Sequence, residues 1–290
     1  MKVILSRKGF DSKYGGCPSP IFPDGSMFSL PIPSSDDSRC FGEINYGQHN
    51  LGQVVESLTK GRHSSTSLTH FDPDLSPLAI PRQTGWLPSL GQVNAALTHL
   101  HNQSVEVGDL FLFFGWFDDV EEDVNRLFRH TSRCNNRHVI FGWLQIGEIL
   151  DVGSDGAAAL VKKPWLEKHP HVIGEWNKKN KIYIASKSLN LPTVISAKTI
   201  AGGGMFDNIT PNRTLTQPGQ GNRSLWALPK AFSPENGAAT LSYHENSAKW
   251  STSKNPEKIL LDSAKIGQEF VLKVSDPKIL TNWLSDIFTN

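Results

Sequence analysis

Two long apolar stretches, at 110–117 and 139–150, carry the strongest hydrophobic pattern in the chain. Both are rich in aromatic and β-branched residues, which is the composition of buried β-strands. Glycines recur inside and at the ends of both stretches, and they indicate bulges or strong coiling of the kind that closes a small barrel. The pattern therefore predicts two central strands of a sheet.

Shorter patterns predict the remaining elements. Short apolar runs predict strands at 2–5, 181–186, 224–228, 240–244, 259–262 and 269–274. Apolar residues at helical spacing predict helices at 51–58, 91–101 and 118–130, and a last helix after Pro277. Residues 201–224 are rich in Gly, Asn, Thr and Pro, which is typical of a long loop or lid. Together these elements predict an α+β fold.

Length and charge limit the organisation and the partners. The chain has 290 residues, of which 38% are hydrophobic, so it is long enough to bury a substantial core. We expect a single domain over 1–290, with a soft boundary near 151–156. The 29 Lys and Arg residues nearly balance the 28 Asp and Glu residues, so no overall field attracts polyanions. Any contact with nucleic acid must therefore come from local patches.

Cysteine usage and hydropathy indicate the compartment. Cys17, Cys40 and Cys134 are an odd number at wide spacings and contain no Cys-x-x-Cys pair, which favours a reducing environment. The first apolar run is too short for a signal peptide, and no window approaches the roughly 20 apolar residues of a membrane span. We therefore expect a cytoplasmic protein.

The loop after the first strand is the first candidate site. Its polar and glycine residues are Ser6, Arg7, Lys8, Asp11, Gly15 and Gly16. Charged donors at a strand end, with glycines that free backbone N–H groups nearby, fit a cradle for an anion such as phosphate. Asp11 can orient Arg7 or Lys8. An ordinary surface loop with solvated cations is the alternative, and the sequence leaves both open.

The second candidate is His70-x-Asp72-x-Asp74. In an extended segment alternate side chains share one face, so an imidazole and two carboxylates would converge on one divalent cation, Mg²⁺ or Mn²⁺, or on one ribose. The alternative is an Asp-Pro-Asp turn that is capped by its own side chains, with His70 as a hydrogen-bonded spacer. Three candidate ligands are too few to specify a metal.

The third candidate is His169-Pro170-His171, flanked by Trp165 and Trp176. Proline favours an extended segment, and an indole near imidazoles can stack on a base. Two histidines separated by one residue ligate zinc only with partners from elsewhere, and the sequence does not identify such partners.

Further aromatic and basic residues are candidate nucleotide contacts. Trp116 and Trp143 occupy glycine-flanked strand positions at which a cleft would open, so either indole is a candidate for stacking on a base. Arg223, with Lys230 and His244, is a candidate for binding phosphate or carboxylate. For each of them a structural role, in the core or at a strand end, remains open.

The two central strands also resemble a known architecture. A Gly-Asp turn, an apolar strand, an insert and a second strand that ends Ile-Gly-Glu-Ile are similar to the PUA-like pseudobarrels, including the EVE and ASCH domains. Those barrels commonly hold RNA or a modified base in a cleft beside the barrel. The resemblance implies a small β-barrel core of mixed or antiparallel strands, with packed helices and long loops.

A set of motifs along most of the chain looks like the third nucleotide modification associated domain family. They are Lys-Val-Ile-Leu-Ser-Arg-Lys-Gly-Phe-Asp-Ser at 2–12, Gly-Gly-Cys-Pro-Ser-Pro-Ile at 15–21, His-Phe-Asp-Pro-Asp-Leu at 70–75, Gly-Asp-Leu-Phe-Leu-Phe-Phe-Gly-Trp-Phe at 108–117 and Phe-Gly-Trp-Leu-Gln-Ile-Gly-Glu at 141–148. That family was proposed as part of microbial and phage systems that modify DNA bases. The resemblance implies a site at Ser6, Arg7, Lys8, Asp11, His70, Asp72 and Asp74.

Three functions remain open from the sequence. The first is a protein that binds nucleotides or nucleic acid, DNA foremost, and is associated with base modification or its recognition, with Arg7 and Lys8 on phosphate. The second is a metal-dependent nuclease or nucleotide transferase. In it His70, Asp72 and Asp74, with Asp11 as a further candidate ligand, bind Mg²⁺ or Mn²⁺, and Arg7 and Lys8 stabilise the charge that develops on the transferred phosphate. The third is a non-catalytic interaction component of a phage-defence system, with other modification or defence proteins as partners.

Overall fold

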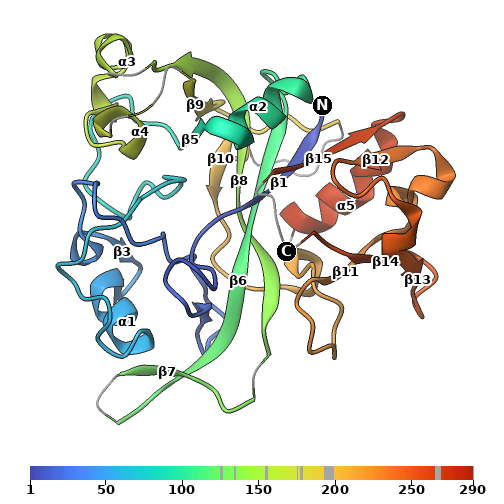
Figure 1. The fold of residues 1–290 in the computed structure, drawn as a ribbon, viewed down its shortest axis with the longest axis horizontal. Coiled ribbons are helices and arrows are strands. Elements are labelled where there is room, and N and C mark those ends of the chain that lie inside the picture. The colour runs from blue at the N-terminus through green and yellow to red at the C-terminus, as the bar shows by residue number, and fades with distance from the viewer. Residues whose placement is uncertain are drawn as a thin grey trace.

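A computed structural model describes residues 1–124, 127–133, 135–153, 156–174, 176, 179–192, 199–264 and 269–289. One large, mostly antiparallel sheet dominates it, with two small sheets and short helices around it (Figure 1). The α+β class predicted from the sequence is therefore confirmed.

The large sheet has ten strands, and its main path runs β12-β15-β1-β6-β8-β9-β5. The strands on this path are β12 (Ala239–Leu241), β15 (Glu269–Val274), β1 (Val3–Arg7), β6 (Leu110–Glu122), β8 (Arg137–Asp151), β9 (Asn180–Ala185) and β5 (Ser89–Val93). β2 (Ser19–Ile21) and β7 (Phe128–His130) pair with β6, and β10 (Gly203–Met205) pairs with β8. Among the described residues β12 and β5 do not pair with each other, so the closed PUA-like barrel is not confirmed.

β6 and β8 form the spine of the sheet, as their apolar patterns predict (Figure 1). Their antiparallel register shifts between Phe113 and Phe114, which is a bulge next to Gly115. Phe111, Phe113 and Phe114 have no exposed surface, so this spine is also the centre of the main apolar core.

The remaining strands form two small sheets. β11 (Leu225–Pro229), β14 (Lys258–Asp262) and β13 (Trp250–Thr252) form one, and β3 (Asn45–Tyr46) with β4 (His49–Asn50) forms the other. The α-helices are α1 (Leu51–Leu58), α2 (Asn94–Asn102), α3 (Ala157–Lys162), α4 (Pro170–Ile173) and α5 (Lys278–Phe288). Short 3₁₀ turns lie at Phe41–Glu43, Pro164–Leu166, Pro211–Arg213, Lys230–Phe232, Pro234–Asn236 and Ser247–Lys249.

The two best amphipathic helices lie where the sequence predicts them. α1 begins after Asn50, whose side chain accepts a hydrogen bond from the Gly52 N–H, and its apolar face packs in a second core cluster. α5 buries Leu280 and Trp283 on the main core, together with the apolar residues one turn further on. Figure 1 shows these helices on opposite sides of the β6–β8 spine.

Four predicted elements differ from the structure in whole or in part, and in three of them pairing between strands overrides the local pattern. The expected helix at 118–130 is instead the end of β6 with β7, where Glu121 faces Arg129 across the strands in an ion pair of 2.8 Å. The expected helix at 91–101 begins only at Asn94, because β5 continues through Val93 in pairing with β9. Residues 201–224, expected as a loop, include β10, which pairs with β8, and the 3₁₀ turn at Pro211–Arg213.

The fourth correction concerns the segment expected to be extended at Pro170. Pro170 is instead the first residue of α4, a position that its fixed φ and missing N–H suit. Part of the soft boundary near 151–156 lies outside the described residues. Among the described helices, none is long and apolar enough to cross a lipid bilayer.

Candidate metal centre

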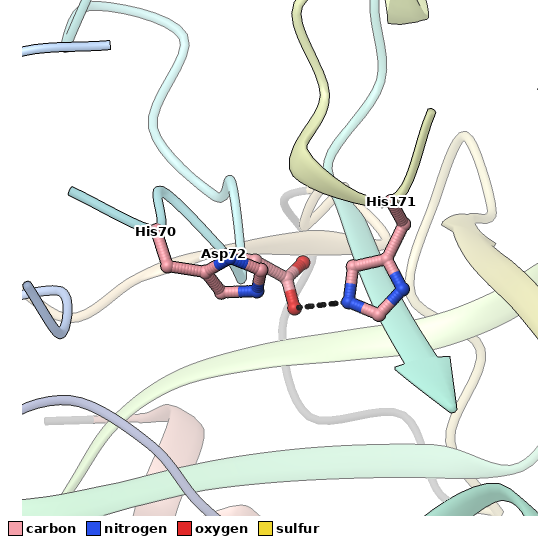
Figure 2. A group of neighbouring side chains, drawn as sticks. All are labelled: His70, Asp72 and His171. Atoms are coloured by element: carbon pink, nitrogen blue, oxygen red, sulfur yellow. Dashed lines mark ion pairs between the residues drawn. The ribbon is translucent and has the colours of Figure 1, made fainter. Parts of the chain in front are cut away.

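Three side chains from two distant segments converge beside β5: His70, Asp72 and His171 (Figure 2). His70 and Asp72 belong to the segment that precedes β5, and His171 belongs to α4. One ligand atom of each residue lies within 4.8 Å of the other two. These three residues, called the metal group below, form a candidate metal site.

β5 determines where the carboxylate lies. The backbones of Asp74 and Ser89 exchange two hydrogen bonds of 3.0 Å, which fixes this segment against the start of β5. Two residues away, Asp72 Oδ1 accepts a hydrogen bond of 2.8 Å from the Gly91 N–H. Position 91 must be a glycine because a Cβ there would lie 2.1 Å from Cδ2 of His171. The bare backbone of β5 therefore lets Asp72 and His171 approach each other.

Hydrogen bonds determine which nitrogen of each imidazole is free. Nδ1 of His70 lies 3.0 Å from Asp37 Oδ2, which can only accept when ionised, so Nδ1 carries the hydrogen. Asn180 Nδ2 donates to the His171 carbonyl over 2.7 Å, and this orients its Oδ1 to accept from His171 Nδ1–H over 2.9 Å. Nε2 of both imidazoles therefore keeps its lone pair, as in metal-binding histidines.

His169 has the opposite tautomer. Its Nδ1 accepts a hydrogen bond of 3.2 Å from the His171 N–H, so Nε2 carries the hydrogen when the ring is neutral. Nε2 is buried, has no hydrogen-bond partner and lies 3.6 Å from Asp72 Oδ1, which is too long for a hydrogen bond. His169 Nε2 is therefore a hydrogen-bond donor, whereas Nε2 of His70 and Nε2 of His171 are acceptors or metal ligands.

The protonation states of His171 and Asp72 favour a cation between them. Burial, and then the neighbouring His70, lowers the pKa of His171 to about 3, so the ring is neutral. Burial raises the pKa of Asp72 to about 6. The contact of 3.8 Å between His171 Nε2 and Asp72 Oδ2 is therefore no ion pair near pH 7, but a lone pair facing a carboxylate. Two ligands with metal bonds of about 2.1 Å are separated by roughly this distance at a wide bond angle.

The donor set also indicates which metals fit. Imidazole suits Fe²⁺ and Zn²⁺, the carboxylate also suits Mn²⁺, and Mg²⁺ prefers a set of oxygen ligands alone. Two imidazoles and one carboxylate leave coordination positions open for water or substrate, which is the arrangement of catalytic rather than structural sites.

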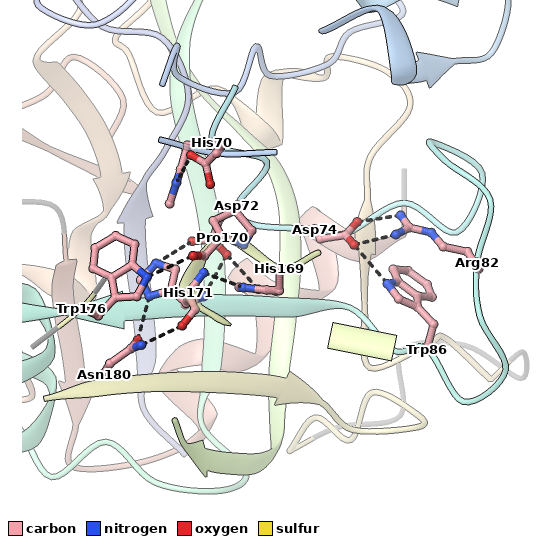
Figure 3. A network of polar contacts seen from close by, with 12 residues as sticks. His70, Asp72, Asp74, Arg82, Trp86, His169, Pro170, His171, Trp176 and Asn180 are labelled. Carbon is pink, nitrogen blue, oxygen red and sulfur yellow. Dashed lines mark hydrogen bonds and ion pairs between the residues drawn. The ribbon is translucent and has the colours of Figure 1, made fainter. Parts of the chain in front are cut away.

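Asp74, the third residue of the predicted ligand pattern, does not join this group. Both of its carboxylate oxygens accept hydrogen bonds of 2.6 Å from Arg82, and one accepts a bond of 3.1 Å from Trp86 Nε1. Figure 3 shows Asp74 directed to Arg82 and Trp86, with His169 between it and Asp72. The segment thus brings His70 and Asp72 together and directs Asp74 to another feature.

The basic residues after the first strand are divided between the two faces of β1. Lys8 Nζ lies 3.1 Å from the buried Glu269, and its charge lowers the pKa of Asp72, so it belongs to the side of the metal group. Ser6, on the same face, is fully buried. Arg7 lies on the opposite face, where it donates to the Ala264 carbonyl over 2.7 Å.

The glycine loop has a structural explanation. Asp11 accepts hydrogen bonds of 2.7 and 2.6 Å from the N–H groups of Lys13 and Tyr14, as in a tight turn. Gly15 has a φ of +88°, and a Cβ there would lie 2.2 Å from the Phe10 ring. Gly16, with a φ of +74°, completes the same turn. These residues shape the loop around Phe10.

The predicted base-stacking residues lie elsewhere. Trp116 donates through Nε1 to Asn136, and the Arg223 guanidinium lies 4.2 Å from the centre of its ring. Trp143 donates to the Ala201 carbonyl over 2.9 Å and packs on Phe206. The contacts described for these residues do not include the metal group.

Sequence reasoning missed the contributions of His171, Asn180 and Asp37. His171 had been noted for its neighbour two residues earlier, but no spacing connects it to His70. Asn180 is the first residue of a strand, and Asp37 lies in a polar stretch without a pattern. Only the folded chain shows that they belong together.

A family model described as nucleotide modification associated domain 3 matches residues 2–273. The chain belongs to this family. The match runs from β1 into β15 and includes every residue of the metal group, so the resemblance found in the sequence motifs is confirmed. The name of the family associates the chain with nucleotide modification. No curated protein and no solved structure matches the chain.

Proposed function

We propose that this protein is a transition-metal-dependent enzyme that acts on a nucleotide, free or within nucleic acid, at His70, Asp72 and His171. The observation that carries the proposal is that two imidazoles, each with Nδ1 occupied by a partner, leave Nε2 lone pairs beside one buried carboxylate. Membership of a nucleotide modification family supports the substrate class.

The side chains around the centre suit Lewis-acid chemistry. A bound cation would polarise a substrate oxygen or lower the pKa of a bound water. Asp37 and Asn180 would hold the two imidazoles in place, and Lys8, which pairs with Glu269, would help to keep Asp72 ionised as a ligand by lowering its pKa. His169 would supply a hydrogen-bond donor next to the open coordination positions.

A reader of modified bases without catalytic activity is the second candidate, and it has less support. It relies on a PUA-like barrel and on Trp116 or Trp143 as a stacking surface. The described strands do not close into a barrel, and Arg223 covers one face of Trp116. An interaction component of a defence system is a third proposal, and no feature of the described residues favours it over the other two.

The test begins with metal binding. Calorimetry and elemental analysis with Mn²⁺, Zn²⁺, Mg²⁺ and anaerobic Fe²⁺ should show one ion per chain and a preference over Mg²⁺. Asp72→Ala should abolish binding, whereas Asp74→Asn, a change in the same segment outside the group, should retain it. Mass spectrometry of nucleotides and of DNA incubated with the loaded protein would then identify the product. Equal metal binding by Asp72→Ala and the wild type would refute the proposal.

A further inference from the structure

A cavity of about 560 Å³ opens next to the metal group, on the side to which Asp74 points. Its walls include Arg39, Arg82, Trp86, Trp165 and His169. This volume lies within the range of sites that bind small organic ligands. None of these residues is a member of the metal group, but His169 lies beside Asp72.

His169 connects the cavity to the metal group. It is one of the residues that line the cavity, and its Nε2 lies 3.6 Å from Asp72 Oδ1. Because Nδ1 accepts from the His171 N–H, the buried and unpartnered Nε2 is a hydrogen-bond donor. Figure 3 shows His169 between Asp72 and the Asp74–Arg82 pair. Only the ring of His169 would therefore separate a molecule in the cavity from the carboxylate of Asp72.

The walls offer flat surfaces for an aromatic ring. The Arg82 guanidinium lies 4.0 Å from the centre of the Trp86 ring, and its two bonds to Asp74 hold it there. Trp165 lies nearby, because a Cβ on Gly85 would be 3.8 Å from its Cδ1. Indole rings and guanidinium planes are the groups on which nucleobases stack.

The cavity also has cations without a carboxylate partner. In the part of the chain that the structure describes, neither Arg39 nor Lys168 makes an ion pair, although both line the cavity. Arg82 is neutralised by Asp74, and Glu167 accepts a hydrogen bond of 2.8 Å from Gln83 Nε2. Arg39 lies 5.9 Å from the centre of the Phe71 ring, and its charge lowers the pKa of Asp74, but among the described residues no carboxylate pairs with it directly. Arg39 and the exposed Lys168 are thus the cations of the cavity wall that an anionic group could contact.

We propose that this cavity binds a nucleoside 5′-monophosphate unit. The base lies against Trp165 and the Arg82–Trp86 stack, and the phosphate lies at Arg39 and Lys168. The ring of His169 forms the wall between this unit and Asp72. This inference rests on the proposed function, because it identifies the substrate site of that centre.

The experiment compares deoxyadenosine 5′-monophosphate with deoxyadenosine, by calorimetry and tryptophan fluorescence, on Mn²⁺-loaded full-length protein. Arg39→Ala should weaken binding of the monophosphate about tenfold or more and leave the nucleoside unchanged, since only the phosphate loses a charged donor. Trp165→Leu should weaken both ligands by about 5- to 150-fold through lost stacking. Lys258→Ala, in a separate cavity of about 660 Å³, is the control and should bind both ligands normally.

Binding of single-stranded oligodeoxyadenylate, measured alongside, distinguishes a free nucleotide from one in a strand. Monophosphate binding that is unchanged in both Arg39→Ala and Trp165→Leu, or lost only in Lys258→Ala, would overturn the inference. Mn²⁺ affinity measured in the same variants keeps the two proposals separate. Wild-type protein that binds Mn²⁺ but not the monophosphate contradicts this inference alone, and failure to bind any metal contradicts the proposed function.

Discussion

The side chain of Asn180 fixes the ring of His171 by accepting from Nδ1–H and donating to the His171 carbonyl at the same time. Such a partner behind a metal ligand typically contributes 10- to 100-fold to affinity. We therefore expect Asn180→Ala to weaken metal binding by about this factor in calorimetry. Asn180→Asp keeps the acceptor and should bind metal within a few-fold of the wild type. Equal losses in both variants would assign Asn180 a role in folding alone.

The close approach of Gly91 to His171 leads to a second prediction. Gly91→Ala introduces a methyl group where Cδ2 of His171 lies, so α4 must shift away from Asp72. We expect the free energy of unfolding to fall by about 1–3 kcal/mol and the metal affinity to fall by at least tenfold. Ser89→Ala, on the same strand, should change neither quantity much, since its hydroxyl is buried without a partner. Metal titrations and urea unfolding of the two variants make the comparison.

Arg82 and Asp74 should matter for stability and not for the metal. Arg82→Ala leaves a buried carboxylate without its cation, and such changes cost about 3–5 kcal/mol. The exposed Arg129–Glu121 pair is the matched control, and Arg129→Ala should cost no more than about 1 kcal/mol. Urea unfolding measures both. Metal affinity of folded Arg82→Ala protein should equal that of the wild type, and a loss would place Asp74 in the metal group after all.

His138 should make the protein less stable in acid. It accepts a hydrogen bond of 2.9 Å from Trp226 Nε1, and burial, with Arg7 and Arg223 nearby, lowers its pKa well below the ordinary 6.5. The unfolded chain therefore takes up a proton below pH 6.5 that the folded chain does not. The stability contributed by the neutral ring is present above pH 6.5 and is lost as the pH falls, by at most about 1.4 kcal/mol per pH unit.

The substitution His138→Gln tests this by keeping an acceptor for Trp226 without a titrating group. We expect the free energy of unfolding, measured between pH 5 and 7.5, to depend less on pH in the variant than in the wild type. Parallel curves for the two proteins would show that His138 takes up its proton over the same pH range in the folded and unfolded states, which contradicts the prediction.

Local pattern predicted the parts of the fold that local interactions determine. β6 and β8 have long apolar stretches, and α1 and α5 have apolar residues at helical spacing; each lies within about five residues of its expected range. A helix was wrongly predicted at 118–130 because the charge pattern of two paired strands resembles that of a solvent-exposed helix face. Only the pairing of Glu121 with Arg129 across β6 and β7 distinguishes the two.

Only two of the three residues of the metal group, His70 and Asp72, could be predicted together from the sequence, for a similar reason. His70 and Asp72 share a short segment, so their alternation placed them together. His171 joins them because β5 pairs with β9, whose first residue is Asn180, and that pairing brings distant segments into contact. Asp74 diverges because its backbone pairs with Ser89 and its carboxylate meets Arg82.

The position of β1 between β6 and β15 has a consequence for how the chain is made. β1 is synthesised long before its antiparallel neighbour β15, which covers residues 269–274. Until those residues are synthesised, one edge of this strand, whose residues Val3 to Leu5 are apolar and buried, has no partner, and an unpaired edge favours intermolecular pairing. Such long-range closure also makes folding slow. Because intermolecular pairing depends on the concentration of unfolded chains, a lower expression level should raise the fraction of correctly assembled protein.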